Sequence, residues 1–259
     1  MKSIFNSKIL VLFIALAFTL SCTEDSPSLG KETSSGVDGI GGGSGQGGSL
    51  ARFTIANNHL YVVTFNAIFT YSLANAAEPE YKGKTSITTV AETVYSMGDY
   101  LFLGTQNGVE ILSISNPANP TRVSTYSHIT SCDPVVARGN YAYSTLRTGT
   151  NCNRGVNMLD VINISNIKNP YAENSISMEN PKGLGISGEF LYVCDNSKLK
   201  TFEILSGGSL KYLREMPING CFDVIGQDGK LIVVSADGVS QFTVDGIGDL
   251  ALQSKISVE

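Results

Sequence analysis

The sequence predicts an all-β protein, a five-bladed β-propeller of four-stranded repeats of about 42 residues each. One pattern, a turn followed by a short apolar run, recurs about every forty residues. The five copies occupy residues 58–63, 98–103, 139–144, 188–193 and 229–234. Apolar and polar residues alternate after the turn, as in 109–114, which is typical of half-buried strands. Four short strands per repeat at this period are typical of a propeller blade.

The repeats divide the chain from residue 49 onward without remainder. Their expected bounds are 49–88, 89–128, 129–178, 179–218 and 219–259. In repeat two we expect strands at 92–97, 100–104, 108–115 and 122–127. The domain begins with a first strand and ends with a fourth, so ring closure would depend on packing the first blade against the fifth. An open stack or a missing sixth blade is the alternative.

The N-terminal residues have the composition of a targeting segment. Lys2 and Lys8 precede an apolar run over residues 9–20, too short to span a bilayer, which predicts a signal peptide at 1–21. Ser21-Cys22 resembles a bacterial lipobox, which implies lipidation of Cys22 and an outer-membrane lipid as partner. An ordinary secretory signal with a chance cysteine is the alternative. Residues 22–48 are rich in Gly, Ser and acids and predict a flexible tether.

Charge and location follow from the same region. Acidic residues after Cys22 resemble the surface-export signal of Bacteroidetes lipoproteins, which implies the outer face of the outer membrane; the periplasmic face is the alternative. Loss of residues 1–21 lowers Lys+Arg from 18 to 16 against 23 Asp+Glu, a net charge of 16 − 23 = −7. This balance argues against a nucleic-acid partner.

One repeat carries a family resemblance. Residues 109–120, VEILSISNPANP, resemble the LVIVD repeat, in which an apolar strand leads into an Asn-Pro turn. Residues 159–166 are a divergent second copy. The chain from Cys22 onward is similar to LVIVD-repeat lipoproteins of Bacteroidetes. The resemblance implies a propeller and implies no activity.

A charged residue lies six positions before each copy of the pattern. These residues are Arg52, Glu92, Asp133, Lys182 and Asp223. Because the position starts the innermost strand, we expect a ring of charge around the mouth of the central channel. Glu92, Asp133 and Asp223 could serve a glycoside hydrolase as acid and base. The preferred interpretation is a structural ring, because neighbouring cations lower carboxylate pKa values and oppose a general acid.

Four cysteines remain after Cys22, an even number that suits an oxidising compartment. We expect disulfides Cys132–Cys152 and Cys194–Cys221. No Cys-x-x-Cys pair is present and the two histidines are scattered, so we expect no metal.

The first bridge would clamp an insertion in repeat three that carries further polar candidates. These are Arg147, Asn151 and Arg154. A long loop held by a disulfide suits recognition. We therefore expect a monomeric, non-enzymatic binding module for a protein or glycan, without cofactor, with the hydrolase as alternative.

Overall fold

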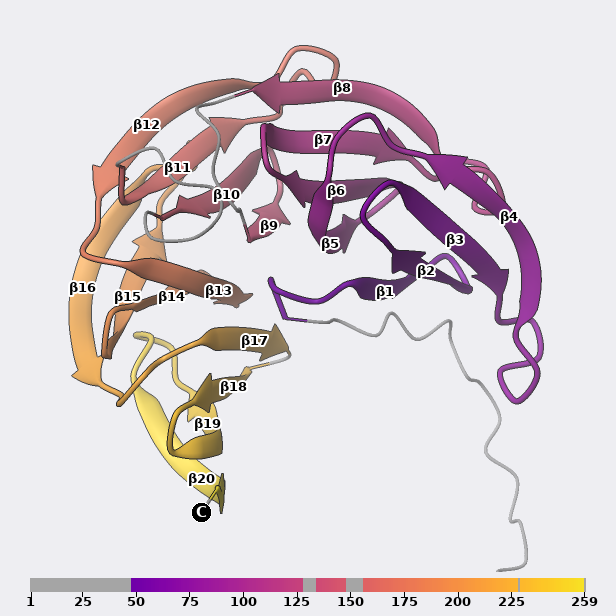
Figure 1. The fold of residues 1–259 in the computed structure, drawn as a ribbon. Helices are drawn as coiled ribbons and strands as arrows, with labels where there is room; N and C mark the ends of the chain where they lie inside the picture. Colours follow the sequence, from indigo (N-terminus) through magenta and orange to yellow (C-terminus); the bar gives the residue numbers. More distant parts are fainter. Residues whose placement is uncertain (1–47, 128–133, 148–155, 228, 259) are drawn as a thin grey trace, which may run out of the picture. The chain divides into compact units, whose positions relative to one another are not determined.

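The computed structural model describes residues 48–127, 134–147, 156–227 and 229–258, which form twenty β-strands. The strands make five four-stranded antiparallel sheets, each from consecutive strands. The sheets surround a central axis as the blades of a five-bladed β-propeller, with the first strand of each blade innermost (Figure 1). The predicted fold class is confirmed. Across these residues no helix is long and apolar enough to cross a membrane.

Each blade keeps the order of its strands in the chain. Blade 1 contains β1 (Phe53–Ala56), β2 (His59–Val63), β3 (Ala67–Ser72) and β4 (Glu80–Ser86). Blade 2 contains β5 (Ala91–Met97), β6 (Tyr100–Thr105), β7 (Gly108–Ser113) and β8 (Thr121–Ser127). Blade 3 contains β9 (Val135–Arg138), β10 (Tyr141–Leu146), β11 (Met158–Asn163) and β12 (Tyr171–Ser177). Blade 4 contains β13 (Pro181–Ser187), β14 (Phe190–Asp195), β15 (Lys198–Ile204) and β16 (Leu210–Pro217). Blade 5 contains β17 (Asp223–Gln227), β18 (Lys230–Ser235), β19 (Gly238–Val244) and β20 (Leu250–Ser257).

The first hairpin of each blade turns in two residues, but the turn chemistry differs between blades. Gly98, Gly139 and Gly188 each occupy the first turn position with positive φ, which glycine adopts without strain. In blade 1 both turn residues, Asn57 and Asn58, have positive φ, as in a type I′ turn. In blade 5 the glycine, Gly229, is the second turn residue. The recurring pattern is therefore displaced by one residue in the first and last repeats.

Neighbouring blades pack face to face along the chain. We call the face of a blade that points to the following blade its forward face, and the opposite face its backward face. The third residue of the second strand lies on the forward face, and in three blades it is a buried tyrosine. Tyr61, Tyr143 and Tyr192 each donate their hydroxyl to a carbonyl in the next blade's outer turn. The acceptors are Pro117, Gly208 and Gly248, at 2.9, 3.2 and 3.1 Å.

Burial keeps these phenols in their donor form. It raises the pKa of all three, that of Tyr143 to about 12, because the charged phenolate would lose its hydration. We call each of these hydrogen bonds between blades a tyrosine latch. Each latch satisfies a polar group inside an apolar interface.

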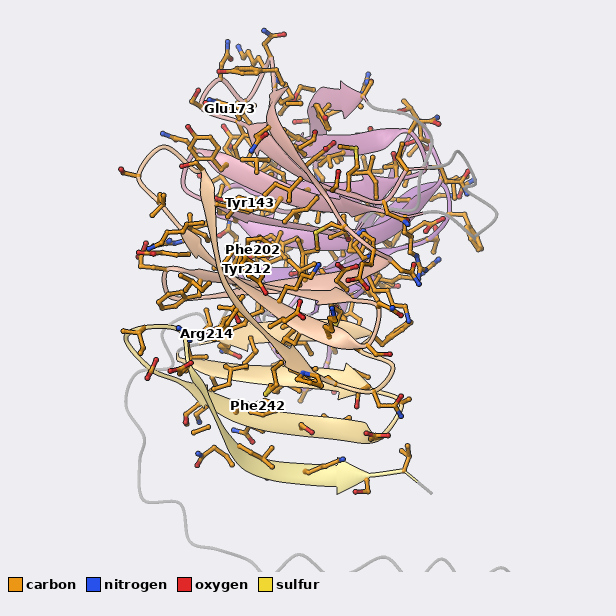
Figure 2. All side chains as sticks on the ribbon, turned by 90° about the vertical axis from the view of Figure 1, so that its left-hand side faces the viewer. Tyr143, Glu173, Phe202, Tyr212, Arg214 and Phe242 are labelled. Atoms are coloured by element: carbon orange, nitrogen blue, oxygen red, sulfur yellow. A yellow bond between two sulfur atoms is a disulfide. The ribbon has the colours of Figure 1, made fainter. Side chains whose placement is uncertain are left out.

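Aromatic side chains also pack within a blade. Figure 2 shows Tyr143 within the stacked sheets, and the exposed Tyr212 beside the buried Phe202, with ring centroids 5.7 Å apart.

The apolar core lies between the blades. One buried cluster joins blades 1 and 2, a second extends from blade 2 to blade 4, and a third joins blades 4 and 5. Ion pairs reinforce two of these interfaces: Arg138 pairs with Glu189, and Arg214 pairs with Asp249. The third cluster includes Cys194 and Cys221, which form the second predicted disulfide. That prediction is confirmed.

The ring is open between its first and last blades. β1 packs against β5, β5 against β9, β9 against β13 and β13 against β17. Among the described residues, no packing of similar extent joins β17 to β1. Figure 1 shows blade 1, in indigo, and blade 5, in yellow, separated across this opening. The simplest predicted closure, blade 1 packed on blade 5, is therefore not seen.

Candidate functional site: the mouth of the central channel

The first strands of the blades bring four of the predicted charged residues to one end of the channel. Arg52 directly precedes β1, Glu92 is the second residue of β5, and Lys182 is the second residue of β13. Asp223 begins β17. Asp133, Asn151, Arg154 and the pair Cys132–Cys152 lie outside the described residues, as does Cys22.

These charged residues do not occupy one equivalent position. Glu92 and Lys182 lie five residues before the ends of their strands, at Met97 and Ser187. Arg52 and Asp223 lie four residues before the ends of theirs, at Ala56 and Gln227. Since side chains alternate along a strand, a shift of one residue changes the direction of the side chain. The spacing of glycines in the sequence concealed this shift, because glycine takes the first turn position in some blades and the second in another.

Asp223 is buried by the segment that leads into blade 1. Ser49 donates its hydroxyl to Asp223 at 2.9 Å and accepts the backbone N–H of Leu184 at 2.8 Å. The N–H groups of Leu50 and Val224 also donate to the carboxylate. Gly48 and Gly183 leave space for it, since a Cβ on either would collide with the carboxylate. Asp223 therefore fastens the start of the domain to blades 4 and 5.

This burial decides what Asp223 can do. The side chain is 8% exposed, and desolvation raises its pKa, although the hydrogen bonds from Val224, Ser49 and Leu50 oppose that rise. A raised pKa suits a general acid, but substrate would have to displace Ser49 to reach the carboxylate. We assign Asp223 a structural role, which removes one of the three carboxylates from the hydrolase hypothesis.

The remaining charges at the mouth are half-buried or exposed. Glu92 lies at an irregularity in the pairing of β5 with β6 and accepts a hydrogen bond from Gln106 at 3.4 Å. Lys182 lies at a matching irregularity in blade 4. Arg147 is half-buried directly after β10 and is not without a partner. Among the described residues, the Asp223 carboxylate forms hydrogen bonds with Ser49, Leu50 and Val224 and no ion pair with Lys182.

Two exposed phenylalanines accompany the cations, and neither was predicted from the sequence. Phe65, in the turn between β2 and β3, is 63% exposed and its ring centroid lies 5.0 Å from the Arg52 guanidinium. Phe222, directly before β17, is 47% exposed and lies 6.0 Å from the Lys182 ammonium. Arginine or lysine over an aromatic ring is a cation–π contact. A large aromatic residue just outside a predicted strand is the sequence signal that could have identified them.

The confirmed disulfide positions one of these pairs. Cys221 is buried next to Phe222 and is bonded to Cys194, the last but one residue of β14. The backbone of Phe222 also donates to the carbonyl of Val234 and accepts from Gly183. The aromatic ring is thus exposed from a rigid backbone, which lowers the entropic cost of binding.

The described residues provide no metal site at the mouth. No group of three or more His, Cys, Asp or Glu residues in this part of the chain could hold an ion.

Three of the hollows formed by the described residues lie away from the mouth. Two of these lie between the first hairpin turn of one blade and the outer turn of the next blade, near Tyr141 and near Phe190, and the third lies on the forward face of blade 5. The described residues at the mouth form a surface of cations and aromatic rings.

Comparison with known proteins supports the fold. Residues 90–128, which span blade 2, match the LVIVD repeat. No curated protein matches the chain in sequence.

Three solved structures illustrate the range of similar propellers. Periplasmic gluconolactonase PpgL of Pseudomonas aeruginosa is 14% identical with a TM-score of 0.59, over 78% of this chain and 68% of that one. AztD of Citrobacter koseri is 12% identical with a TM-score of 0.53, over 78% and 61%. BamB of Moraxella catarrhalis is 11% identical with a TM-score of 0.51, over 78% and 62%. Their names differ in function, so the likeness supports the fold alone.

Proposed function

We propose that this protein is a lipid-anchored protein of the outer membrane, displayed on the cell exterior, that binds a protein or glycan without catalysis. The observation that carries the proposal is the pair of exposed phenylalanines, each with a cation beside its ring, at the mouth of the channel. Exposed aromatic rings held by rigid backbone are typical of binding surfaces. The burial of Asp223 under Ser49 supports a binding role over hydrolysis.

The chemistry of this surface defines what it would recognise. Aromatic faces pack on the apolar faces of sugars or on side chains of a protein, and the cations Arg52 and Lys182 add hydrogen-bond donors. Glu92 places a carboxylate on the same rim. A ligand with both apolar and polar groups fits this combination.

The binding test uses residues 48–259 and immobilised polysaccharides and envelope proteins. The double variant Phe65→Ala, Phe222→Ala is expected to lower affinity at least tenfold, since anchoring aromatics contribute about 2 kcal/mol or more each. Tyr171→Ala is the matched control, because Tyr171 is 51% exposed on the outer strand β12, away from the mouth. Equal loss in the control would contradict the assignment of the surface.

The hydrolase alternative has its own readout. Release of reducing sugar from the same polysaccharides, abolished by Glu92→Gln, would replace the binding proposal with an enzyme. The location is tested by metabolic labelling with palmitate, which Cys22→Ser should abolish. Protease accessibility on intact cells then separates the exterior from the periplasmic face.

A further inference from the structure

The two end blades differ from the inner blades in the burial of equivalent residues. The second residue of the second strand lies on the backward face. It is fully buried in blades 2 to 5, as Leu101, Ala142, Leu191 and Leu231, but Leu60 of blade 1 is only half-buried. The third residue lies on the forward face. It is fully buried in blades 1 to 4, as Tyr61, Phe102, Tyr143 and Tyr192, but Ile232 of blade 5 is only half-buried.

Other positions repeat this contrast. Phe53 pairs with Val62 on the backward face of blade 1 and is 57% exposed, whereas Val94, its equivalent in blade 2, is 2% exposed. Ile256 pairs with Val239 on the forward face of blade 5 and is 72% exposed. Its equivalent Tyr126 is 8% exposed. Both end faces are therefore apolar at positions that the other blades bury.

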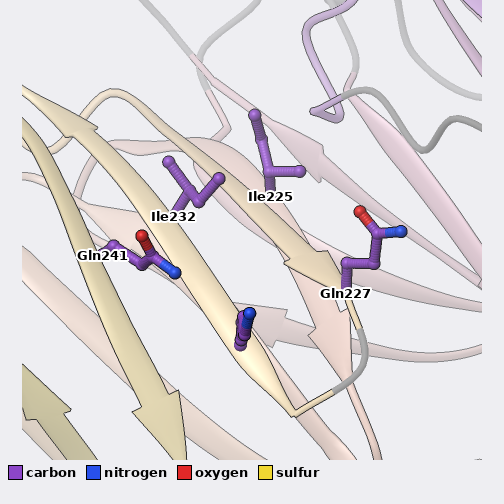
Figure 3. A pocket seen from close by; sticks show the side chains of 5 residues that line it. Ile225, Gln227, Ile232 and Gln241 are labelled. Atoms are coloured by element: carbon purple, nitrogen blue, oxygen red, sulfur yellow. The ribbon is translucent and has the colours of Figure 1, made fainter. Parts of the chain in front are cut away.

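The forward face of blade 5 is hollowed at its centre. Ile225, Ile232 and Gln241 are cross-strand neighbours there, and with Gln227 and Lys230 they line a hollow of about 260 Å³ (Figure 3). In blades 3 and 4 the same place on the forward face holds the side chain of a tyrosine that reaches the following blade. The hollow thus marks where a following sheet would pack.

We propose that the opening between blades 5 and 1 is a docking slot for one β-sheet from another protein. Each inner blade lies between the forward face of the blade before it and the backward face of the blade after it. The opening presents the same two walls, the forward face of blade 5 and the backward face of blade 1. The occupant must be an antiparallel sheet with apolar side chains on both faces, continuous with the series of interfaces already present.

Other occupants satisfy the slot less well. In a second copy of this chain every blade has at least one face covered by a neighbour, so a blade of that copy could cover one wall but not both. Residues 23–47 are Gly-, Ser- and acid-rich and carry too few apolar side chains to fill an apolar gap. An exposed apolar surface of this kind on both walls marks an interaction site.

The test uses blade 2 as the probe, and circular dichroism of the fused blade first establishes that it is folded as a β-sheet. Residues 88–127, which form blade 2 and contain no cysteine, are fused to a carrier protein and mixed with residues 48–259. We expect a 1:1 complex by light scattering. Phe53→Lys on one wall and Ile232→Lys on the other should each weaken it at least tenfold. Lys168→Glu, on an exposed turn of blade 3, is the control and should leave it unchanged.

Three results would overturn the proposal. One is a probe that fails to bind at tens of micromolar while the wild type also fails to bind the apolar dye ANS, which would mean that the ring closes on itself. Another is a wild-type dimer abolished by Ile232→Lys, which would make a second copy the occupant. The third is probe binding that Phe53→Lys and Ile232→Lys leave unchanged, which would place the probe elsewhere. None of these results depends on the channel mouth.

Discussion

The interface between blades 4 and 5 and the opening between blades 5 and 1 are built from the same repeat, yet one is closed and the other is not. The first has a disulfide, a tyrosine latch and an ion pair across a buried apolar cluster. In the second, apolar residues at matching positions are exposed or half-buried, and Gly48 and Ser49 lie against blade 5 at Ile225 and Asp223. The difference teaches that the sequence of a repeat makes the faces of its blade apolar, whereas the presence of an adjacent blade decides whether such a face is buried.

The largest contrast is expected from one substitution made at two equivalent positions. Leu191→Ala, on the fully buried backward face of blade 4, should lower the free energy of unfolding by about 4 kcal/mol, because it removes buried methyl groups and leaves a cavity. Leu60→Ala, at the same position of blade 1, should cost about 1 kcal/mol or less. Urea unfolding measures both. Equal losses would mean that Leu60 is buried in solution.

The next effect tests the closed interface through its covalent link. Cys194 and Cys221 enclose a segment of 27 residues, for which the chain-entropy relation gives about 3.5 kcal/mol. Replacing both by alanine should lower the free energy of unfolding by that order. The reducing agent dithiothreitol should destabilise the wild type and have little effect on the variant. Loss of binding at the mouth is also expected, because Phe222 follows Cys221 in the chain.

A smaller effect comes from the latches. Tyr192→Phe removes the hydroxyl that donates to the carbonyl of Gly248 and leaves that buried acceptor without this donor, at a cost of about 1 kcal/mol. Tyr143→Phe should behave alike, since its hydroxyl reaches Gly208. Ile232→Tyr places a tyrosine at the equivalent position of blade 5. With no following blade it should add no stability, and a gain of 1 kcal/mol would show that the opening closes in solution.

The smallest effect is a change in pH dependence at Asp223. Burial raises the pKa of this carboxyl, so the folded protein holds the proton more tightly than the unfolded chain does. Its contribution to stability is therefore fully present below the unfolded value and is lost as the pH rises through the folded pKa. Asp223→Asn removes this titration and keeps an acceptor for Ser49. As the pH rises from the ordinary value of an aspartate, about 4, through the folded pKa, the variant should lose less stability than the wild type; parallel curves would contradict the raised pKa.

Much of the candidate site could not be found from sequence for a geometric reason. The sequence placed Arg52, Glu92, Lys182 and Asp223 near the starts of inner strands, which the structure bears out. The sequence pattern aligned these residues by the turns that follow them. Blade 1 has Asn57-Asn58 where blades 2 to 4 have a turn that begins with glycine, and this difference shifted the alignment by one residue. The cation–π pairs were missed because Phe65 and Phe222 come close to Arg52 and Lys182 only in the folded chain.

The sequence by itself determined the all-β class, the five repeats, their four-strand composition and the Cys194–Cys221 bridge. These follow from local patterns: alternation of apolar residues, turn chemistry, and cysteines that the repeat places at one end of adjacent blades. Only the tertiary structure decided that Asp223 is buried under Ser49 and that the ring stays open between blades 5 and 1. Both depend on contacts between residues far apart in the chain, where a strand pattern specifies an apolar face but not what lies against it.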